Sequence, residues 1–418
     1  MSTLTPLRTA FFAFVVGIFV FNVFACQVLV APIAHGIGLS PSQASLVPTL
    51  TALGYALGLI FLVPLADVVE NRRLVTLLGI GCSAALLLAA LVQQVVVFLA
   101  MCLAIGATAS LVQILVPLVG SLTPPAERGR TLGNVMSGVM LGIMLSRPIG
   151  SLVGAQLGWR AVYALSALVV ALVLVPLRAA LPVRAPATAI HYREAVGSLV
   201  TLVRREPVTR TNAITAALVM GAFNLFWTAI TSQLTSGFGL SARGIALFGI
   251  VGTAGAVSAP LMGRLGDRGW TRIAAIVADI AVIGALLLAL VSGGALATTS
   301  PTLGIAGLVA AAILLDFGVV GDQTLGRRAI NLLDPAAIGR RNGIFVGIFF
   351  LGGAAGSALA GPMSAAFGWT GLCLTGAAFG AAALTVSLLA PRIAGTRLRK
   401  QQPRVWDGNL QRPCEERA

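Results

Sequence analysis

The chain has little charge and few of the groups that enzymes use for chemistry. Only 10% of its 418 residues are charged and 6% are aromatic, and His occurs twice. A water-soluble domain of this length needs far more charge to cover its surface. The five Cys are scattered, mostly inside apolar runs, without a C-x-x-C pair, which argues against both a disulfide framework and a metal site. We therefore expect neither a metal nor any other cofactor.

Long apolar runs are what the chain has in abundance. Hydrophobic residues make up 57% of it, and they fall in runs of about twenty, each able to cross roughly 30 Å of hydrocarbon as a helix. The first run continues to Ala34, too far for the apolar region of a signal peptide, so we expect it to be retained. Twelve transmembrane helices are predicted, at 11–34, 43–65, 74–92, 95–119, 131–155, 159–177, 211–233, 243–263, 273–292, 303–325, 342–366 and 370–391.

The placement of basic residues predicts the orientation. The net charge of +15 lies in short loops and at the C-terminus, not along an aromatic-rich face, which argues against nucleic-acid binding. Nearly all arginines fall on the side of the two termini, and the opposite loops contain only Arg160 and Arg243. Since positive residues mark the cytoplasmic side, we expect both termini in the cytoplasm.

The two halves of the chain repeat at an offset of 210 residues. Identical pairs are Pro125/Pro335, Ala126/Ala336, Gly129/Gly339, Arg130/Arg340, Gly133/Gly343, Gly142/Gly352, Gly158/Gly368 and Trp159/Trp369. Such repeats predict an all-α polytopic protein with two pseudo-symmetric six-helix bundles around a central cavity. The expected parts are an N-terminal bundle (1–178), a cytoplasmic linker (179–210), a C-terminal bundle (211–391) and a basic tail (392–418).

A charged motif follows the second predicted span. The segment Val63–Arg73 contains Asp67, Arg72 and Arg73, and its counterpart Gly263–Trp270 contains Gly263, Asp267 and Arg268. Over nearly its whole length the chain resembles the major facilitator superfamily, whose members carry a G-x-x-x-D-x-x-G-R-R type motif at this place. Val63 and Glu70 replace the two glycines of that pattern.

We interpret both copies of the motif as cytoplasmic latches between helices. An Asp at a helix end can accept backbone N–H bonds from a neighbouring helix, and Arg can pair across the seam. The alternative is that these are ordinary positive-inside loop charges.

Other segments resemble the bacterial drug and arabinose-type exporters of that family. These are Leu53–Gly58, Gly158–Ala161 and Leu333–Ala337. In the fifth span, Ser146-Arg147-Pro148-Ile149-Gly150 keeps the Pro of an antiporter G-P-x-x-G-G motif but has Arg for its first Gly. The resemblance implies a monomeric alternating-access transporter of the bacterial inner membrane.

Apart from Arg160 and Arg243 at the span ends, four charged residues fall inside predicted spans, where each needs a pairing or a function. Asp316 lies in the tenth span, which lines the central cavity in the family, so this carboxylate can bind and release protons. Gln323 faces the same way, and Gln113 occupies the matching place in the fourth span. Fixed structural pairing is the alternative for Asp316.

The other three charges have different interpretations. We expect Asp322 to form a gate salt bridge with Arg327 or Arg328, and Asp279 to be structural. Arg147, in the outer half of the fifth span, either pairs with Asp316 or another acid or attracts an anionic substrate.

Amide side chains occupy matched places near the middle of the first and seventh spans. Asn22 and Asn224 are equivalents in the repeat, Gln27 lies further out, and Trp227 follows Asn224 by nearly one turn. Amides beside an aromatic surface suit a polar organic substrate. Hydrogen bonding between helices is the alternative.

These features favour a proton-coupled exporter of small organic molecules over an enzyme, a channel and a carrier of organic anions. No G-x-S-x-G turn, His cluster or G-x-G-D protease motif occurs, so an enzyme is not expected. A channel fits less well, since repeated bundles with latches on one side suit a rocking motion. Uptake or uncoupled exchange of an organic anion through Arg147 remains the alternative.

Overall fold

The computed structural model describes residues 5–124, 127–183, 191–252, 255, 258–333 and 338–389. Three parts of the sequence analysis lie outside these residues: the basic tail 392–418, the matched residues Pro125 and Ala126, and the motif segment 334–337. Within the described ranges the chain is helical and contains no β-strand. The predicted all-helical class is therefore confirmed.

The N-terminal half, here residues 5–183, begins with the N-cap of Thr5, whose side chain accepts a bond from the backbone of Arg8. Its elements are α1 (Pro6–Phe24), η1 (Ala25–Leu29), α2 (Val30–Ile37), α3 (Pro41–Ala44), α4 (Leu46–Leu57), η2 (Gly58–Leu62), η3 (Val63–Asp67), α5 (Asn71–Leu91), α6 (Val95–Ala109), α7 (Val112–Ser121), α8 (Arg128–Leu157) and α9 (Trp159–Ala180).

The linker helix α10 (Tyr192–Arg205) precedes the C-terminal half, here residues 207–389. The elements of that half are α11 (Pro207–Ser232), η4 (Gln233–Gly237), α12 (Ala242–Gly252), α13 (Ser258–Asp267), α14 (Thr271–Gly293), α15 (Ala295–Thr299), α16 (Pro301–Asn331) and α17 (Ile338–Leu389).

Ten helical segments among the described residues are long and apolar enough to cross a membrane. The difference from the expected twelve has two sources. The predicted eighth span corresponds to α12 and α13, each too short alone, which flank residues 253–257. The predicted eleventh and twelfth spans both lie in the 52-residue α17, within which the backbone turns at Gly368, at φ 61°. A left-handed backbone of this kind favours glycine, and its repeat partner Gly158, at φ 84°, separates α8 from α9.

Glycines at matched positions bring helices of each half into close contact. Gly142 of α8 lies against the backbone of Gly17 in α1, and Gly352 of α17 lies against the backbone of Ala217 in α11. A Cβ atom at either glycine would overlap the opposing carbonyl. The sequence repeat is therefore also a repeat of packing, using small residues where membrane helices approach closely.

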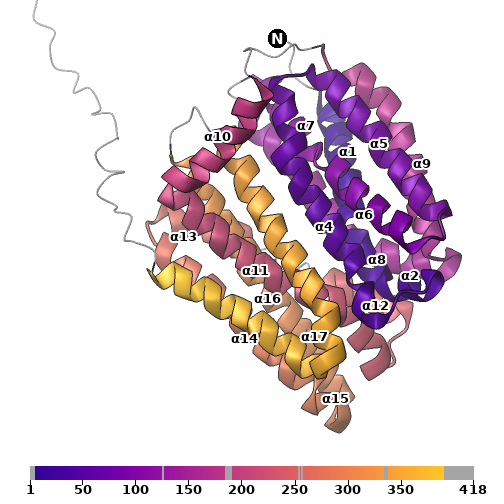
Figure 1. Ribbon diagram of the computed structural model, residues 1–418. Helices are drawn as coiled ribbons and strands as arrows, with labels where there is room; N and C mark the ends of the chain where they lie inside the picture. The colour runs from indigo at the N-terminus through magenta and orange to yellow at the C-terminus, as the bar shows by residue number, and fades with distance from the viewer. Residues whose placement is uncertain are drawn as a thin grey trace, which may run out of the picture.

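The two halves pack together chiefly through α4 with α17 and through α8 with α12. The Ser151 hydroxyl of α8 donates to the carbonyl of Ala242 at the start of α12, at 3.0 Å. Gly361 of α17 lies against the carbonyl of Ser42 in α3. The α8–α12 and α3–α17 contacts join the halves at the end of the molecule opposite to the start of α1 (Figure 1).

The helix α10 lies at the other end, near the start of α1 (Figure 1). Its buried residues Ala195 and Leu199 follow a helical spacing, a signal that the Arg- and Pro-rich character of segment 179–210 obscured. The Tyr192 hydroxyl donates to the carbonyl of Phe61 in the π-helical turn η2, at 2.8 Å. Since α10 also contacts α11 and α17, it touches both halves.

Candidate functional site

The side chain of Arg147 lies buried where α8 meets the C-terminal half. It is 1% exposed, and Gly249 of α12 lies against its Cβ atom. Its Nε and one terminal guanidinium nitrogen have no hydrogen-bond partner among the described residues. An unpaired buried guanidinium is costly, so its remaining contacts must offset that cost.

The main contact of the Arg147 guanidinium is with the ring of Trp227 in α11. Its central carbon lies 3.7 Å from the ring centroid, and 5.4 Å from the centroid of Phe223. A desolvated cation over a Trp face contributes about 2 kcal/mol. Phe226 and Phe248 pack edge-on against the same indole, which fixes the orientation of the ring.

The polar edge of the indole faces Asp316. Trp227 Nε1 donates to Asp316 Oδ1 at 3.1 Å. The opposite charges of Arg147 and Asp316 attract each other, but they form no ion pair among the described residues. Arg147 was predicted to pair with an acid or to attract an anionic substrate. In the structure it does not touch Asp316 in an ion pair among the described residues, but Trp227 contacts both side chains.

A second polar contact joins the halves nearby. Gln27 Nε2 of η1 donates to Asn224 Oδ1 of α11 at 3.0 Å, and both side chains are buried. Asn22 behaves differently from its repeat equivalent, because its Nδ2 donates to the carbonyl of Ile18 in its own helix, at 3.0 Å. Asn224 and Gln27 therefore belong to the contact between the halves, whereas Asn22 is satisfied locally.

The two glutamines predicted to line the cavity are partly exposed, in α7 and α16. Gln113 interacts with the hydroxyl of Tyr55 in α4, and the same hydroxyl is close enough to Arg327 for an electrostatic interaction. Gln323 lies one turn before Arg327 on α16. Arg327 and Tyr55 were not assigned to this group from the sequence, since only the tertiary structure brings them together.

Asp322 does not form the predicted salt bridge. Arg328 pairs with Asp267 instead, with Arg328 Nε 3.0 Å from Asp267 Oδ1. Asp322 is buried between Thr215 and Asp279, and its Oδ2 has no hydrogen-bond partner among the described atoms. The reason is helical phase, since Arg327 and Arg328 project about 140° and about 120° away from Asp322 around the axis of α16.

Asp279 is fully buried in α14. Its Oδ2 accepts a hydrogen bond from the Ser387 hydroxyl of α17 at 2.7 Å, and its Oδ1 has no partner among the described residues. Arg272 is seven residues before Asp279 and therefore on the same face of α14. Its guanidinium donates to the carbonyl of Leu388.

The two motif copies differ in the structure. Asp67 and Arg73 are exposed, and neither they nor Arg72 form an ion pair within the described ranges. In the second copy, Asp267 pairs with Arg328 inside the C-terminal half. Gly263 has open space around its Cα, and Arg268 is exposed. Neither copy joins the two halves in this arrangement.

Two further features bear on the chemistry of the site. Phe223 and Phe248 pack against Trp227, and the close glycines Gly249 and Gly255 lie against Arg147 and Asp316. The described residues contain no group of three or more His, Cys, Asp or Glu that could hold a metal ion. The charged side chains of the site are Arg147 and Asp316.

Comparison with known sequences finds transporters. The family model described as Major Facilitator Superfamily matches residues 10–321. The chain is 31% identical over 375 residues to the uncharacterized transporter YgaY of Escherichia coli O157:H7, covering 90% of this chain and 93% of the relative. It is also 31% identical to a probable transporter of Streptomyces coelicolor, over 88% of this chain and 84% of the relative.

Solved structures share the fold. A bacterial homolog of the human lysosomal transporter Spinster, inward-facing and unoccupied, superposes with a TM-score of 0.71 at 18% identity, covering 93% of this chain and 97% of that one. A D-xylose-proton symporter gives 0.67 at 15% identity (92% and 98% covered). The human organic anion transporter MFSD10 gives 0.62 at 16% identity (92% and 100% covered).

Proposed function

We propose that this chain, which belongs to the major facilitator superfamily, is a proton-coupled exporter of small organic molecules. It is a multi-pass membrane transporter and not an enzyme. Membership of the family leaves open the direction of transport, the coupling ion and the substrate class.

The proposed topology has twelve spans with both termini in the cytoplasm of a bacterial inner membrane. The pair α12–α13 supplies the eighth span, and α17 supplies the eleventh and twelfth on either side of Gly368. The distribution of arginine supports the orientation. The end closed by α3–α17 and α8–α12 contacts is then the outer end, and the structure is an inward-facing state of a monomer.

One observation carries the coupling proposal: Trp227 links a cation of the N-terminal half to an acid of the C-terminal half. When Asp316 is charged, it accepts the indole N–H bond and attracts Arg147. Protonation removes that charge, and both interactions weaken. Proton binding at Asp316 thus loosens a contact that holds the outer end closed.

This arrangement can prevent a wasteful transport cycle. An empty, deprotonated carrier keeps its halves joined through Arg147, Trp227 and Asp316, so it does not open outward. A substrate that binds between Arg147 and Asp316 weakens their attraction and permits the outer end to open. A proton from outside then binds Asp316 as the substrate leaves. Such differential stabilisation of two states is what coupling requires.

The polar groups around this contact support a polar organic substrate. Asn224 and Gln27 can donate and accept hydrogen bonds, and Gln27 Oε1 has no partner among the described residues. Trp227 adds an aromatic face. A ligand entering between the halves would replace the Gln27–Asn224 bond with its own.

The unpartnered N–H groups of Arg147 favour a second candidate, an uncoupled carrier of organic anions. Two guanidinium nitrogens, for which the described residues provide no acceptor, can bind a carboxylate or phosphate. Arg147→Gln separates the two functions. An exporter should lose coupling but keep counterflow of labelled substrate, whereas an anion carrier should lose counterflow as well.

The test of proton coupling is proton flux in inside-out vesicles with an acidified lumen and a fluorescent pH probe. A panel of drugs, sugars, amino acids and organic anions would be added to wild type, Asp316→Asn and the control Glu194→Gln. One compound class should raise the lumenal pH in wild type and the control but not in Asp316→Asn. Proton flux persisting in Asp316→Asn would overturn the assignment, and silence with anions still exchanging would favour the anion carrier.

A further inference from the structure

A recess of about 360 Å³ lies at the junction of α10 with the start of α17, far from the Arg147 site. Its lining contains two arginines, one from each helix, and two hydroxyl side chains. The residues are Ser198, Thr201, Leu202, Arg205, Glu206 and Arg340. The recess belongs to the end of the molecule where α1 begins (Figure 1).

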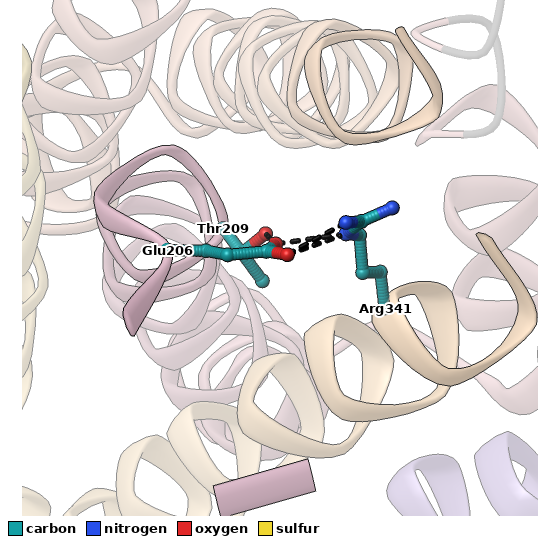
Figure 2. Close-up of polar contacts among 3 residues, drawn as sticks. All are labelled: Glu206, Thr209 and Arg341. Carbon is teal, nitrogen blue, oxygen red and sulfur yellow. Dashed lines mark hydrogen bonds and ion pairs between the residues drawn. The ribbon is translucent and has the colours of Figure 1, made fainter. Parts of the chain in front are cut away.

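The acid of this recess, Glu206, is paired with Arg341. Figure 2 shows the guanidinium of Arg341 facing the Glu206 carboxylate, with Nε 2.8 Å from Oε2 and a terminal nitrogen 2.6 Å from Oε1. The Thr209 hydroxyl also donates to Glu206 Oε2 at 2.8 Å. These bonds, chiefly those from Arg341, lower the pKa of Glu206 against the opposing effect of burial. Glu206 therefore stays charged and committed to Arg341.

The two arginines that line the recess have no such partner. Arg205 and Arg340 are both exposed, and neither forms an ion pair within the described part of the chain. With Glu206 occupied by Arg341, the recess carries an uncompensated double positive charge. Two guanidinium groups from different helices can each offer paired N–H donors to one tetrahedral anion, the geometry that phosphate recognition favours.

The two hydroxyl groups of the recess already donate their protons within α10, so the arginines are the hydrogen-bond donors left for a ligand. Ser198 Oγ donates to the carbonyl of Ala195, and Thr201 Oγ1 donates to the carbonyl of Gly197. Both protons are thus used within α10. We propose that this recess binds a phosphate group, held by Arg205 and Arg340 and bridging the linker helix to α17.

The phosphate can come from a phospholipid headgroup or from a soluble phosphate. Helix α10 is amphipathic, with Ala195 and Leu199 buried and three arginines in its sequence, as in helices that lie at the membrane surface. Arg205 comes two residues before the span that begins at Pro207, and Arg340 is the second residue of the span that begins at Gly339. This position, at headgroup level in the proposed topology, is compatible with either source.

Binding to the full-length protein in detergent tests the proposal. The probes are short-chain phosphatidylglycerol, phosphatidylcholine with the same chains, and inorganic phosphate, with affinity measured by thermophoresis. We expect phosphatidylglycerol or inorganic phosphate to bind, and each arginine removed by Arg205→Gln or Arg340→Gln to weaken binding about tenfold. The double variant Arg193→Gln/Arg204→Gln removes equal charge from α10 outside the recess and should bind as wild type does.

The probes distinguish the sources. Binding of phosphatidylglycerol without inorganic phosphate supports a lipid headgroup, and equal binding of both supports a soluble phosphate. If Arg205→Gln/Arg340→Gln binds as the control double variant does, or if no probe binds wild type, the proposal is overturned. Size-exclusion profiles and thermal unfolding of each variant verify that the protein is folded.

Discussion

The guanidinium of Arg147 lies 3.7 Å from the ring centroid of Trp227, although the two residues belong to different halves of the chain. The same indole donates its N–H to Asp316 at 3.1 Å. Within the described residues the buried cation and the buried acid form no ion pair, and one indole contacts both, with its face toward Arg147 and its N–H toward Asp316. Trp227, which does not titrate, therefore connects Asp316 of the C-terminal half to Arg147 of the N-terminal half.

The two functions of the indole can be separated by substitution. Trp227→Phe keeps an aromatic face for Arg147 and removes the hydrogen bond to Asp316, whereas Trp227→Leu removes both. We expect substrate-independent proton leak in vesicles to increase from wild type to Trp227→Phe and again to Trp227→Leu. Equal leak in both variants would mean that the cation–π contact does not hold the halves together.

The close approach of α1 and α8 predicts a difference between two glycines of α8. Gly142→Ala places a Cβ against the carbonyl of Gly17 and should destabilise the protein by about 1–3 kcal/mol. Gly133→Ala has open space around it, and should be neutral or stabilising by up to about 1 kcal/mol. Thermal unfolding in detergent measures both, and similar melting temperatures for the two variants would contradict this packing.

The Glu206–Arg341 pair predicts a pH-dependent stability. Because this pairing lowers the pKa of Glu206 from the ordinary 4.5, its contribution is present above that value and is lost as pH falls through the lowered pKa. At pH 7, Glu206→Gln should therefore have a free energy of unfolding about 1–3 kcal/mol below that of wild type, and a lower melting temperature. The difference should shrink in strong acid. Glu194→Gln is the control. A pH-independent difference would exclude the ion pair as its cause.

The exposed position of Asp67 predicts a kinetic effect without a stability effect. If its partners form only when the cytoplasmic end closes, Asp67→Asn should leave the melting temperature of this state unchanged and slow transport by about tenfold. The pH profile of transport should not move. A shifted pH optimum would argue against the latch and for a direct part in proton transfer.

Much of the helical architecture follows from the sequence, because run length and apolar composition determine which segments can cross a membrane. The break between the predicted eleventh and twelfth spans coincides with the non-helical backbone of Gly368 inside α17. The helix α10 did not follow from the sequence, since its few buried positions lie among arginines.

The candidate site was only partly predictable for a different reason. Arg147 and Asp316 are conspicuous as charges inside apolar runs, but their connection depends on the orientation of Trp227, which Phe226 and Phe248 fix in three dimensions. Asn22 and Asn224 are equivalent in the sequence repeat and differ in the structure, because only Asn224 faces Gln27 across the seam. Internal symmetry predicts positions within a bundle and not contacts between bundles.

The most direct test of the central claim is the distance across the outer end as a function of pH. Spin labels at Gln43→Cys and Ser364→Cys, exposed residues of α3 and α17, would be introduced after replacing the native cysteines. Electron-electron double resonance should show a short distance at pH 8 and a growing long-distance population as pH falls, while Asp316→Asn shows the long population at every pH. Identical pH-dependent distributions in wild type and Asp316→Asn would contradict the claim that protonation of Asp316 releases the contact between the halves.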